Sequence, residues 1–216
     1  MSTWFTADQH FGDRKIIGLC RRPFASVQEQ DDEQVARWNT VVAPQDEVWV
    51  LGDVALDPLQ ESLQRIQELK GIKRLVVGNH DEPFEHPAGS AEHDQAVRRY
   101  LAAGFTSVHN RLARIQLAGQ QVLLSHFPVQ LAYFEPVDRY AGHRPDDDGS
   151  IIIHGHVHDD DWLMRTTRCG TRQIHVGVDV HAFTPVPAAR ILQLIARRPS
   201  HLVPTRAAGD TDLRRY

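Results

Sequence analysis

Cysteine is scarce in this 216-residue chain, and its two cysteines, Cys20 and Cys169, lie far apart. They form no CxxC pattern, which excludes a disulfide framework and a zinc knuckle and fits the reducing cytoplasm. No apolar run approaches the roughly 20 residues of a membrane span. The opening residues, MSTWFTADQH, also lack the basic and apolar regions of a signal peptide. We therefore expect a cytoplasmic protein with no membrane partner.

Positive charge is also in short supply, because 24 Lys and Arg face 28 Asp and Glu for a net charge of -4. No polybasic arm stands at either end, so nucleic acid is not the favoured partner. Histidine, by contrast, is abundant at 13 residues, which favours metal binding or acid–base chemistry. We expect a single domain over residues 1–198 and a poorly ordered C-terminal extension over 199–216. The oligomeric state stays open.

Short apolar runs that end abruptly in polar residues indicate strands at 3–7, 47–51 and 73–77, and before His126 and Gly155. Helical patterns lie between them, at 27–41, 58–70 and 91–103. This alternation predicts βαβ units and a mostly parallel sheet. A hairpin signal at Ala118-Gly119-Gln120 begins a more antiparallel part near residue 110. The stretch HVGVDVH, residues 175–181, reads as one more strand.

Polar side chains that can bind a metal or move a proton gather at these predicted strand ends. They are Asp8, His10, Asp53, Asn79, His80, His126, His156 and His158. Ligands of open α/β sheets bind at the carboxyl ends of strands. Carboxylate, imidazole and amide oxygen suit Mn, Fe, Zn, Ni or Co better than Mg. The set exceeds the needs of one ion, so we expect two divalent ions, with Asp53 as the bridge.

Five motifs in order resemble the calcineurin-like metallophosphoesterase superfamily. They are Asp8-Gln9-His10, Gly52-Asp53, Gly78-Asn79-His80-Asp81, His126 and Gly155-His156-Val157-His158. The segments WFTADQHFGDRKII and HVGVDVHAFTPV are similar to a compact bacterial and phage branch of predicted phosphoesterases. That branch often has Thr or Ser in place of Gln9 and His in place of Asp13. Both departures touch positions behind the ligands and leave the ligand set complete.

The resemblance implies an α/β fold in which two mixed sheets form a sandwich flanked by helices, α/β/β/α. It assigns Asp8, His10, Asp53 and His158 to a first metal ion, and Asp53, Asn79, His126 and His156 to a second. His80 would lie near the scissile phosphate, and Asp81 would orient its ring. The implied reaction is hydrolysis of a small phosphomonoester or phosphodiester by in-line attack of a hydroxide that bridges the ions. Manganese is favoured for activity in vitro.

Other functions stay open at this point: a metal-dependent nuclease, a non-catalytic interaction module on the same fold, and a single-zinc hydrolase. Substrate contacts beyond the phosphate are expected from the loop at 126–150, although a solvated loop is as plausible there. The candidates are Arg139, Tyr140, His143 and Arg144. Asp179 and His181 are candidate partners of the ligands, whereas His154 is expected to pack inside its strand. The remaining histidines are expected at the surface: His86, His93, His109, His143 and His201.

Overall fold

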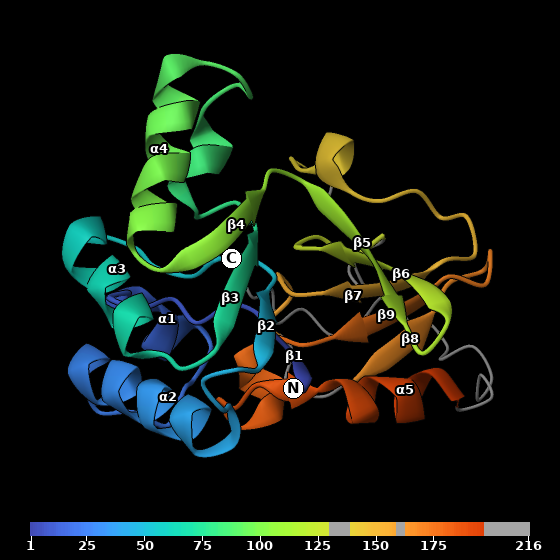
Figure 1. Ribbon diagram of the computed structural model, residues 1–216, viewed down its shortest axis with the longest axis horizontal. Helices are drawn as coiled ribbons and strands as arrows, with labels where there is room; N and C mark the ends of the chain where they lie inside the picture. Colours follow the sequence, from blue (N-terminus) through green and yellow to red (C-terminus); the bar gives the residue numbers. More distant parts are fainter. Residues whose placement is uncertain (130–138, 159–162, 197–216) are drawn as a thin grey trace, which may run out of the picture.

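The computed structural model describes residues 1–129, 139–158 and 163–196. Two five-stranded sheets lie side by side, and helices flank them (Figure 1). This arrangement confirms the predicted sandwich of two mixed sheets. No helix in these three ranges is long and apolar enough to cross a membrane. The extension expected over 199–216 and His201 lie outside the described residues.

The first sheet has the strand order β10-β1-β2-β3-β4. Its four parallel strands are β1 (Thr3–Thr6), β2 (Glu47–Val50), β3 (Ile72–Val76) and β4 (Phe105–His109). The short strand β10 (Val186–Pro187) runs antiparallel beside β1 at one edge. Strands of this kind are apolar on both faces, because helices cover one face and the second sheet covers the other.

The helices are α1 (Arg14–Leu19), α2 (Val27–Val41), α3 (Leu59–Glu68), α4 (Ala91–Ala102) and α5 (Ala188–Ala196). Helix α2 is capped at its N-terminus, since the Ser26 hydroxyl accepts a hydrogen bond from the N–H of Glu29 at 3.1 Å. Trp38, Leu63 and Tyr100 from α2, α3 and α4 pack into one core with apolar residues of β2 and β3. These helices therefore cover the outer face of the first sheet (Figure 1).

The second sheet has the order β5-β6-β7-β9-β8. Its strands are β5 (Leu112–Leu117), β6 (Gln120–Ser125), β7 (Ile151–His154), β8 (Met164–Thr166) and β9 (Arg172–His175). The predicted hairpin joins β5 to β6, with φ of 49° at Ala118 and 81° at Gly119, as a tight hairpin turn requires. A second core lies between the sheets and includes Phe5, Ile153 and, from α5, Ile191.

Two expectations from the sequence were wrong. Residues 175–181 do not continue as a strand, because β9 ends at His175 and a 3₁₀ turn, η3, covers Val178–His181. The N–H of Val178 bonds the Ala7 carbonyl at 3.1 Å, so the chain crosses to the end of β1 instead of extending its own sheet. His93 is buried in α4, with its Nε2 2.9 Å from the Asn110 side-chain oxygen.

Two further 3₁₀ turns, η1 (Glu82–Glu85) and η2 (Ala141–His143), belong to loops near the strand ends. The first follows the β3 motif directly, and the second lies within the long connection from β6 to β7. Both loops therefore approach the edge where the candidate ligands gather.

Candidate metal centre

The candidate ligands follow the carboxyl ends of β1, β2, β3, β6 and β7, and the two sheets meet at this edge. A bridge between Ala7 and Gly177 joins the chain just after β1 to the chain just after β9. The backbone N–H of Asp8 bonds the Gly52 carbonyl, and that of His10 bonds the Asp53 carbonyl, each at 3.0 Å. These contacts bring motifs from both halves of the sequence into one place.

A first group of four buried side chains has its ligand atoms within 4.8 Å of one another. The group consists of Asp8, His10, Asp53 and His158. Asp8 is fixed from behind, because both of its carboxylate oxygens accept from the His156 N–H at 3.0 Å. This is the set expected around the first ion.

A second group contains Asp53, His126 and His156, again within 4.8 Å of one another. The side-chain oxygen of Asn79 lies 3.0 Å from Nε2 of His126, which adds an amide oxygen to the group. His126 is fully buried and His156 is half-buried. The structure thus brings together the four residues expected around the second ion.

Asp53 belongs to both groups, and its two oxygens have different surroundings. Its Oδ1 accepts from the backbone N–H of His80 at 2.9 Å. Its Oδ2 lies 3.6 Å from Nε2 of His10 and 3.4 Å from Nε2 of His126. One oxygen is therefore anchored to the backbone, and the other faces an imidazole of each group.

Three of the imidazoles are held by their Nδ1 atoms. Nδ1 of His10 lies 3.1 Å from the Asp13 carboxylate, and Nδ1 of His126 lies 2.7 Å from the Leu51 carbonyl. Nδ1 of His158 lies 3.1 Å from Asp179. Such partners place the ring proton on Nδ1 and leave Nε2 for a metal ion.

These residues fit divalent ions, because lone pairs converge where a cation is needed. Nε2 of His10 is buried without a hydrogen-bond partner among the described residues. Two ligands bound about 2.1 Å from one ion lie about 3.0–3.4 Å apart, which is close to the spacings around His126. A coordination site built from these side chains thus needs little rearrangement.

The pKa values of the candidate ligands are shifted by burial and by their charged neighbours. Burial alone would lower the pKa of His10 and His126, but neighbouring carboxylates, Asp53 in both cases, raise it to about 9. Burial would raise the pKa of Asp53, yet His126 and His10 hold it well below its usual range. A divalent cation bound at this site would therefore compete with protons on these imidazoles.

The backbone at the candidate ligands is strained. Five of them have left-handed φ values, which non-glycine residues rarely adopt: Asp8 at 64°, His10 at 54°, Asp53 at 55°, His156 at 76° and His158 at 46°. Each such residue costs about 1–2 kcal/mol. Strain concentrated at one cluster indicates that the fold holds these side chains for a function.

Two glycines of the motifs make the close approach of the loops feasible. A Cβ added at Gly78 would lie 2.3 Å from Oδ1 of Asp53, and one at Gly155 would lie 2.7 Å from Oδ2 of Asp8. No side chain fits at these distances, so the glycines let the loops close around the carboxylates.

His80 lies next to the ligands without being in either group. Its side chain is exposed, and its ring centroid is 5.4 Å from that of His10. Partial loss of hydration lowers the pKa of its imidazole. An exposed imidazole beside the first group is available to a substrate.

Asp81 is placed differently from the expectation that it orients the His80 ring. Its buried carboxylate accepts from the backbone N–H groups of Asp53 at 3.0 Å, Val54 at 3.0 Å and Gly78 at 2.8 Å. The Tyr100 hydroxyl adds a longer contact at 3.4 Å. Asp81 therefore ties the loop after β2 to the loop after β3, and it acts on Asp53 rather than on the His80 ring.

The expected substrate contacts divide into two kinds. The rings of Tyr140 and His156 lie 5.5 Å apart, and Arg139 stacks over Tyr140, so this part of the loop borders the second group. His143 is exposed and lies 4.7 Å from the Phe84 ring. Arg144 is instead buried, and its guanidinium donates to the Pro128 carbonyl at 3.1 Å. It holds the loop together and is no longer a candidate contact.

Arg22 has a role that the sequence alone does not reveal. Arg22 is buried and forms an ion pair with Asp179 at 2.7 Å. Burial would raise the pKa of Asp179, but Arg22 and His158 together hold it below its usual range. Asp179 itself was a candidate partner of the ligands, and its contact with His158 confirms that part.

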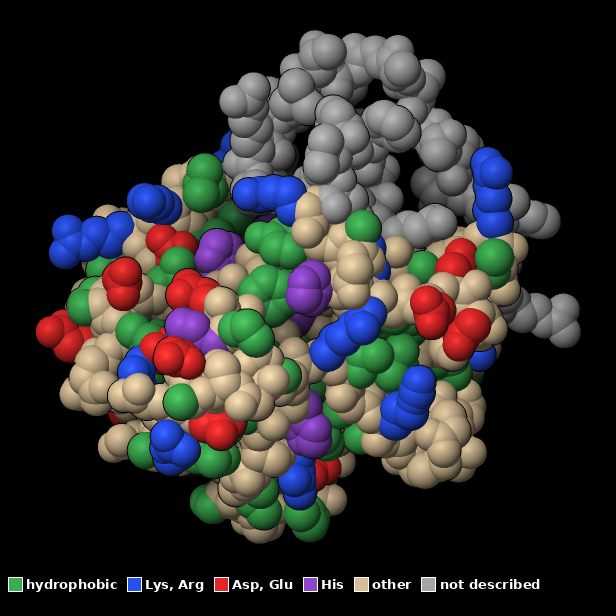
Figure 2. All heavy atoms as spheres, turned by 90° about the horizontal axis from the view of Figure 1, so that it is seen from above, with side chains coloured by type: hydrophobic (Ala, Val, Ile, Leu, Met, Phe, Trp, Pro, Cys, Tyr) green, Lys and Arg blue, Asp and Glu red, His purple; other side chains and the backbone are tan. Residues whose placement is uncertain are grey.

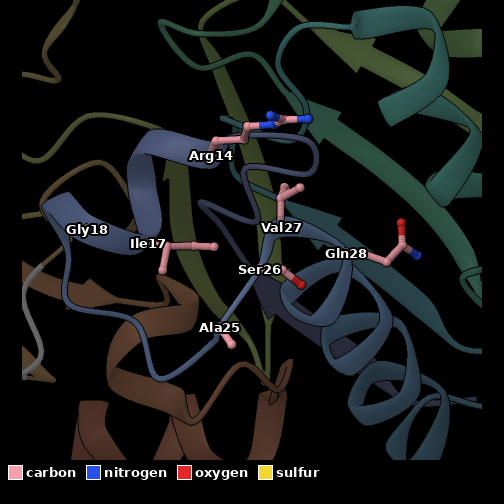
Figure 3. A pocket seen from close by; sticks show the side chains of 7 residues that line it. All are labelled: Arg14, Ile17, Gly18, Ala25, Ser26, Val27 and Gln28. Atoms are coloured by element: carbon pink, nitrogen blue, oxygen red, sulfur yellow. The ribbon is translucent and has the colours of Figure 1, made fainter.

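A surface pocket of about 400 Å³ lies apart from this chemistry, between α1 and the start of α2 (Figure 3). It is lined by Arg14, Ile17, Gly18, Ala25, Ser26, Val27 and Gln28. None of the candidate ligands lines it, so the pocket does not define the site.

Comparisons with known proteins agree with this geometry. Residues 1–182 match the family model of the calcineurin-like phosphoesterase superfamily domain. The gene 66 protein of Mycobacterium phage L5 is 36% identical over 186 residues, which cover 82% of this chain and 86% of that protein. The gene 66 protein of Mycobacterium phage D29 is 33% identical over 196 residues, 88% of this chain and 94% of that protein.

A solved structure shows the same fold. The crystal structure of a protein of unknown function from Aquifex aeolicus aligns with a TM-score of 0.64 at 24% identity. The alignment covers 89% of this chain and 98% of the other. At this level of identity the likeness concerns the fold alone.

Proposed function

This chain belongs to the calcineurin-like phosphoesterase superfamily, and we propose that it hydrolyses a small phosphomonoester or phosphodiester with two divalent metal ions. The observation that carries the proposal is the shared carboxylate of Asp53. Its Oδ2 faces Nε2 of His10 at 3.6 Å and Nε2 of His126 at 3.4 Å. A single oxygen between two ligand groups is the arrangement that a pair of ions requires.

Asp8, His10, Asp53 and His158 would hold one ion, and Asp53, Asn79, His126 and His156 would hold the other. When bound, such ions supply a nucleophile from water at neutral pH and neutralise charge on phosphoryl oxygens. The mixed nitrogen and oxygen ligands favour Mn, Fe, Zn, Ni or Co. Manganese is our choice for assays in vitro.

His80 is the residue that acts on the substrate directly. Its backbone N–H is fixed to Asp53 at 2.9 Å, and its exposed ring lies beside His10. An imidazole in this position donates a hydrogen bond or a proton to the leaving oxygen of the ester. Asp81 contributes indirectly, because its contacts with backbone N–H groups keep the Asp53 and Gly78 loops in register.

Contacts beyond the phosphate come from Arg139, Tyr140 and His143. Tyr140 packs against His156 and Phe127, with ring centroids 5.5 Å and 5.1 Å away. These side chains border the second ligand group, so they are in place to contact the group esterified to the phosphate. We therefore include them in the proposed substrate-binding surface.

A nuclease is the second candidate, because the same chemistry cleaves phosphodiesters of DNA or RNA. On the face seen in Figure 2, basic and acidic side chains of the described residues are interspersed and form no continuous basic surface. The net charge of -4 points the same way. A non-catalytic module is disfavoured, since the proposed ligands and His80 are all present.

The test is a substrate panel with metal-stripped protein, with and without added Mn²⁺. The panel contains aryl mono- and diesters, cyclic nucleotides, nucleotides, and single- and double-stranded DNA. His156→Ala should abolish most turnover, and His154→Ala, two positions away and buried in β7, should retain most of it. Turnover that is independent of metal, or equal losses in both variants, would contradict the proposal.

A further inference from the structure

Arg22 is a buried cation that joins the first motif to a segment near the other end of the chain. Its Nε and one Nη donate to the two oxygens of Asp179 at 2.7 Å and 3.0 Å, in a bidentate pair. The same guanidinium donates to the Asp8 carbonyl at 2.7 Å and the Gln9 carbonyl at 3.0 Å. One side chain therefore holds both the backbone of a ligand and the carboxylate of Asp179.

Asp179, held by Arg22, in turn contacts a second candidate ligand, His158. Its Oδ2 lies 3.1 Å from Nδ1 of His158. A carboxylate that pairs with a guanidinium can only accept hydrogen bonds, so Nδ1 of His158 must carry the ring proton. Nε2 then keeps its lone pair and faces the first group.

The two ligand groups differ in this support. Arg22 and Asp179 contact Asp8 and His158, which belong to the first ligand group and not to the second. In the second group, Nδ1 of His126 is held by the Leu51 carbonyl at 2.7 Å, without any contribution from Arg22 or Asp179. Loss of the Arg22–Asp179 pair should therefore affect the groups unequally.

We propose that Arg22 and Asp179 are positioning residues that set the metal affinity of the first group and leave that of the second unchanged. The inference rests on the two-ion function proposed above. Partners of this kind typically change metal affinity by about 10–100-fold when they are lost. In Asp179→Asn an NH₂ group replaces one of the two carboxylate oxygens. The side chain then cannot accept from both Nε and Nη of Arg22 and also hold the ring proton of His158 on Nδ1.

The experiment measures binding of Mn²⁺ to the metal-stripped full chain by titration calorimetry. Wild type should bind two ions. Asp179→Asn and Arg22→Lys should each weaken one of the two binding events by about 10–100-fold and leave the other within a few fold. Arg37→Lys is the matched control, because Arg37 donates to the Ala182 carbonyl at 3.0 Å in the same segment. It should change neither event.

A second readout uses the metal-free protein, so it does not depend on turnover. Long-range ¹H–¹⁵N spectra of the His158 imidazole should show the proton on Nδ1 in wild type and a mixture of tautomers in Asp179→Asn. If Asp179→Asn fails to fold, Arg22→Lys carries the same test, since it keeps a buried positive charge beside Asp179. Thermal melts in EDTA establish that each variant is folded.

Equal weakening of both binding events, or no weakening of either with an unchanged tautomer, would overturn the positioning role. Those results leave the two-ion proposal standing if wild type binds two ions. Conversely, a wild type that binds fewer than two ions contradicts the proposed function, whatever the variants do.

Discussion

Replacing Asp53 by Asn is the most direct perturbation of the site, because the structure fixes how the amide must sit. The N–H of His80 needs an acceptor at the Oδ1 position, 2.9 Å away. The new NH₂ group then takes the place of Oδ2 and faces Nε2 of both His10 and His126. An NH₂ group has no lone pair for a metal ion, so both ligand groups lose an anionic ligand at once.

The expected magnitude is large at both sites. Loss of a partner behind a ligand costs about 10–100-fold in affinity, and loss of a ligand itself should exceed that. We expect each Mn²⁺ binding event to weaken by at least about 100-fold, or about 2.8 kcal/mol. Calorimetry on metal-stripped Asp53→Asn, with a melt in EDTA to establish folding, measures this.

Asp13→Asn is the matched control for a single site. Oδ1 of Asp13 accepts from the Lys15 N–H at 2.8 Å and caps α1, so the amide oxygen should stay there. The NH₂ then faces Nδ1 of His10 and moves the ring proton to Nε2, which weakens the first group alone. If Asp53→Asn bound two ions as tightly as wild type, or lost only one event as Asp13→Asn does, the bridging role of Asp53 would be refuted.

Three further outcomes follow from individual contacts. His80→Ala should keep both ions and lose about 10²–10⁴-fold in the rate of hydrolysis of alkyl esters. The loss on nitrophenyl esters should be much smaller, because only a poor leaving group needs a proton. Equal losses on both kinds of ester would indicate that His80 stabilises charge on the phosphoryl oxygens instead. Gly78→Ala should disrupt metal binding, since its Cβ would lie 2.3 Å from Asp53, whereas Gly18→Ala meets no atom within 4 Å and should melt no lower than wild type. Burial raises the pKa of Asp31 to about 6 in the fold, so its ionisation opposes folding at neutral pH. Asp31→Asn should therefore be more stable by up to about 3 kcal/mol above pH 6. The gain should vanish below about pH 4 in melts run in EDTA, and a gain that persists there would contradict the assignment.

The ligand set was predictable because its signals are local. Each ligand follows an apolar run, and Gly52, Gly78 and Gly155 mark where the chain turns. Parallel strands bring their carboxyl ends to one edge, so residues at those ends meet whatever the details of packing. The structure groups these residues as the motifs imply, with Asp53 in both groups.

The supporting contacts were not predictable, because they join distant segments or involve backbone atoms. Arg22 and Asp179 are separated by 157 positions, and no pattern in the sequence pairs them. Asp81 binds N–H groups of two loops, and a backbone N–H carries no residue-specific signal. The alternation of HVGVDVH is that of a strand, and only the contact between Val178 and Ala7 shows why the chain turns there.

The strain at the ligands bears on the order in which this site is built. Five left-handed residues at about 1–2 kcal/mol each amount to about 5–10 kcal/mol, which is comparable to the whole stability of a typical domain. Contacts within the fold help to offset that energy. The bonds from Asp8 to Gly52, from His10 to Asp53 and from His156 to Asp8 are such contacts. The two cores on either side of the first sheet add buried apolar surface to these contacts. The ligand geometry is thus coupled to the fold through the contacts that join the motifs.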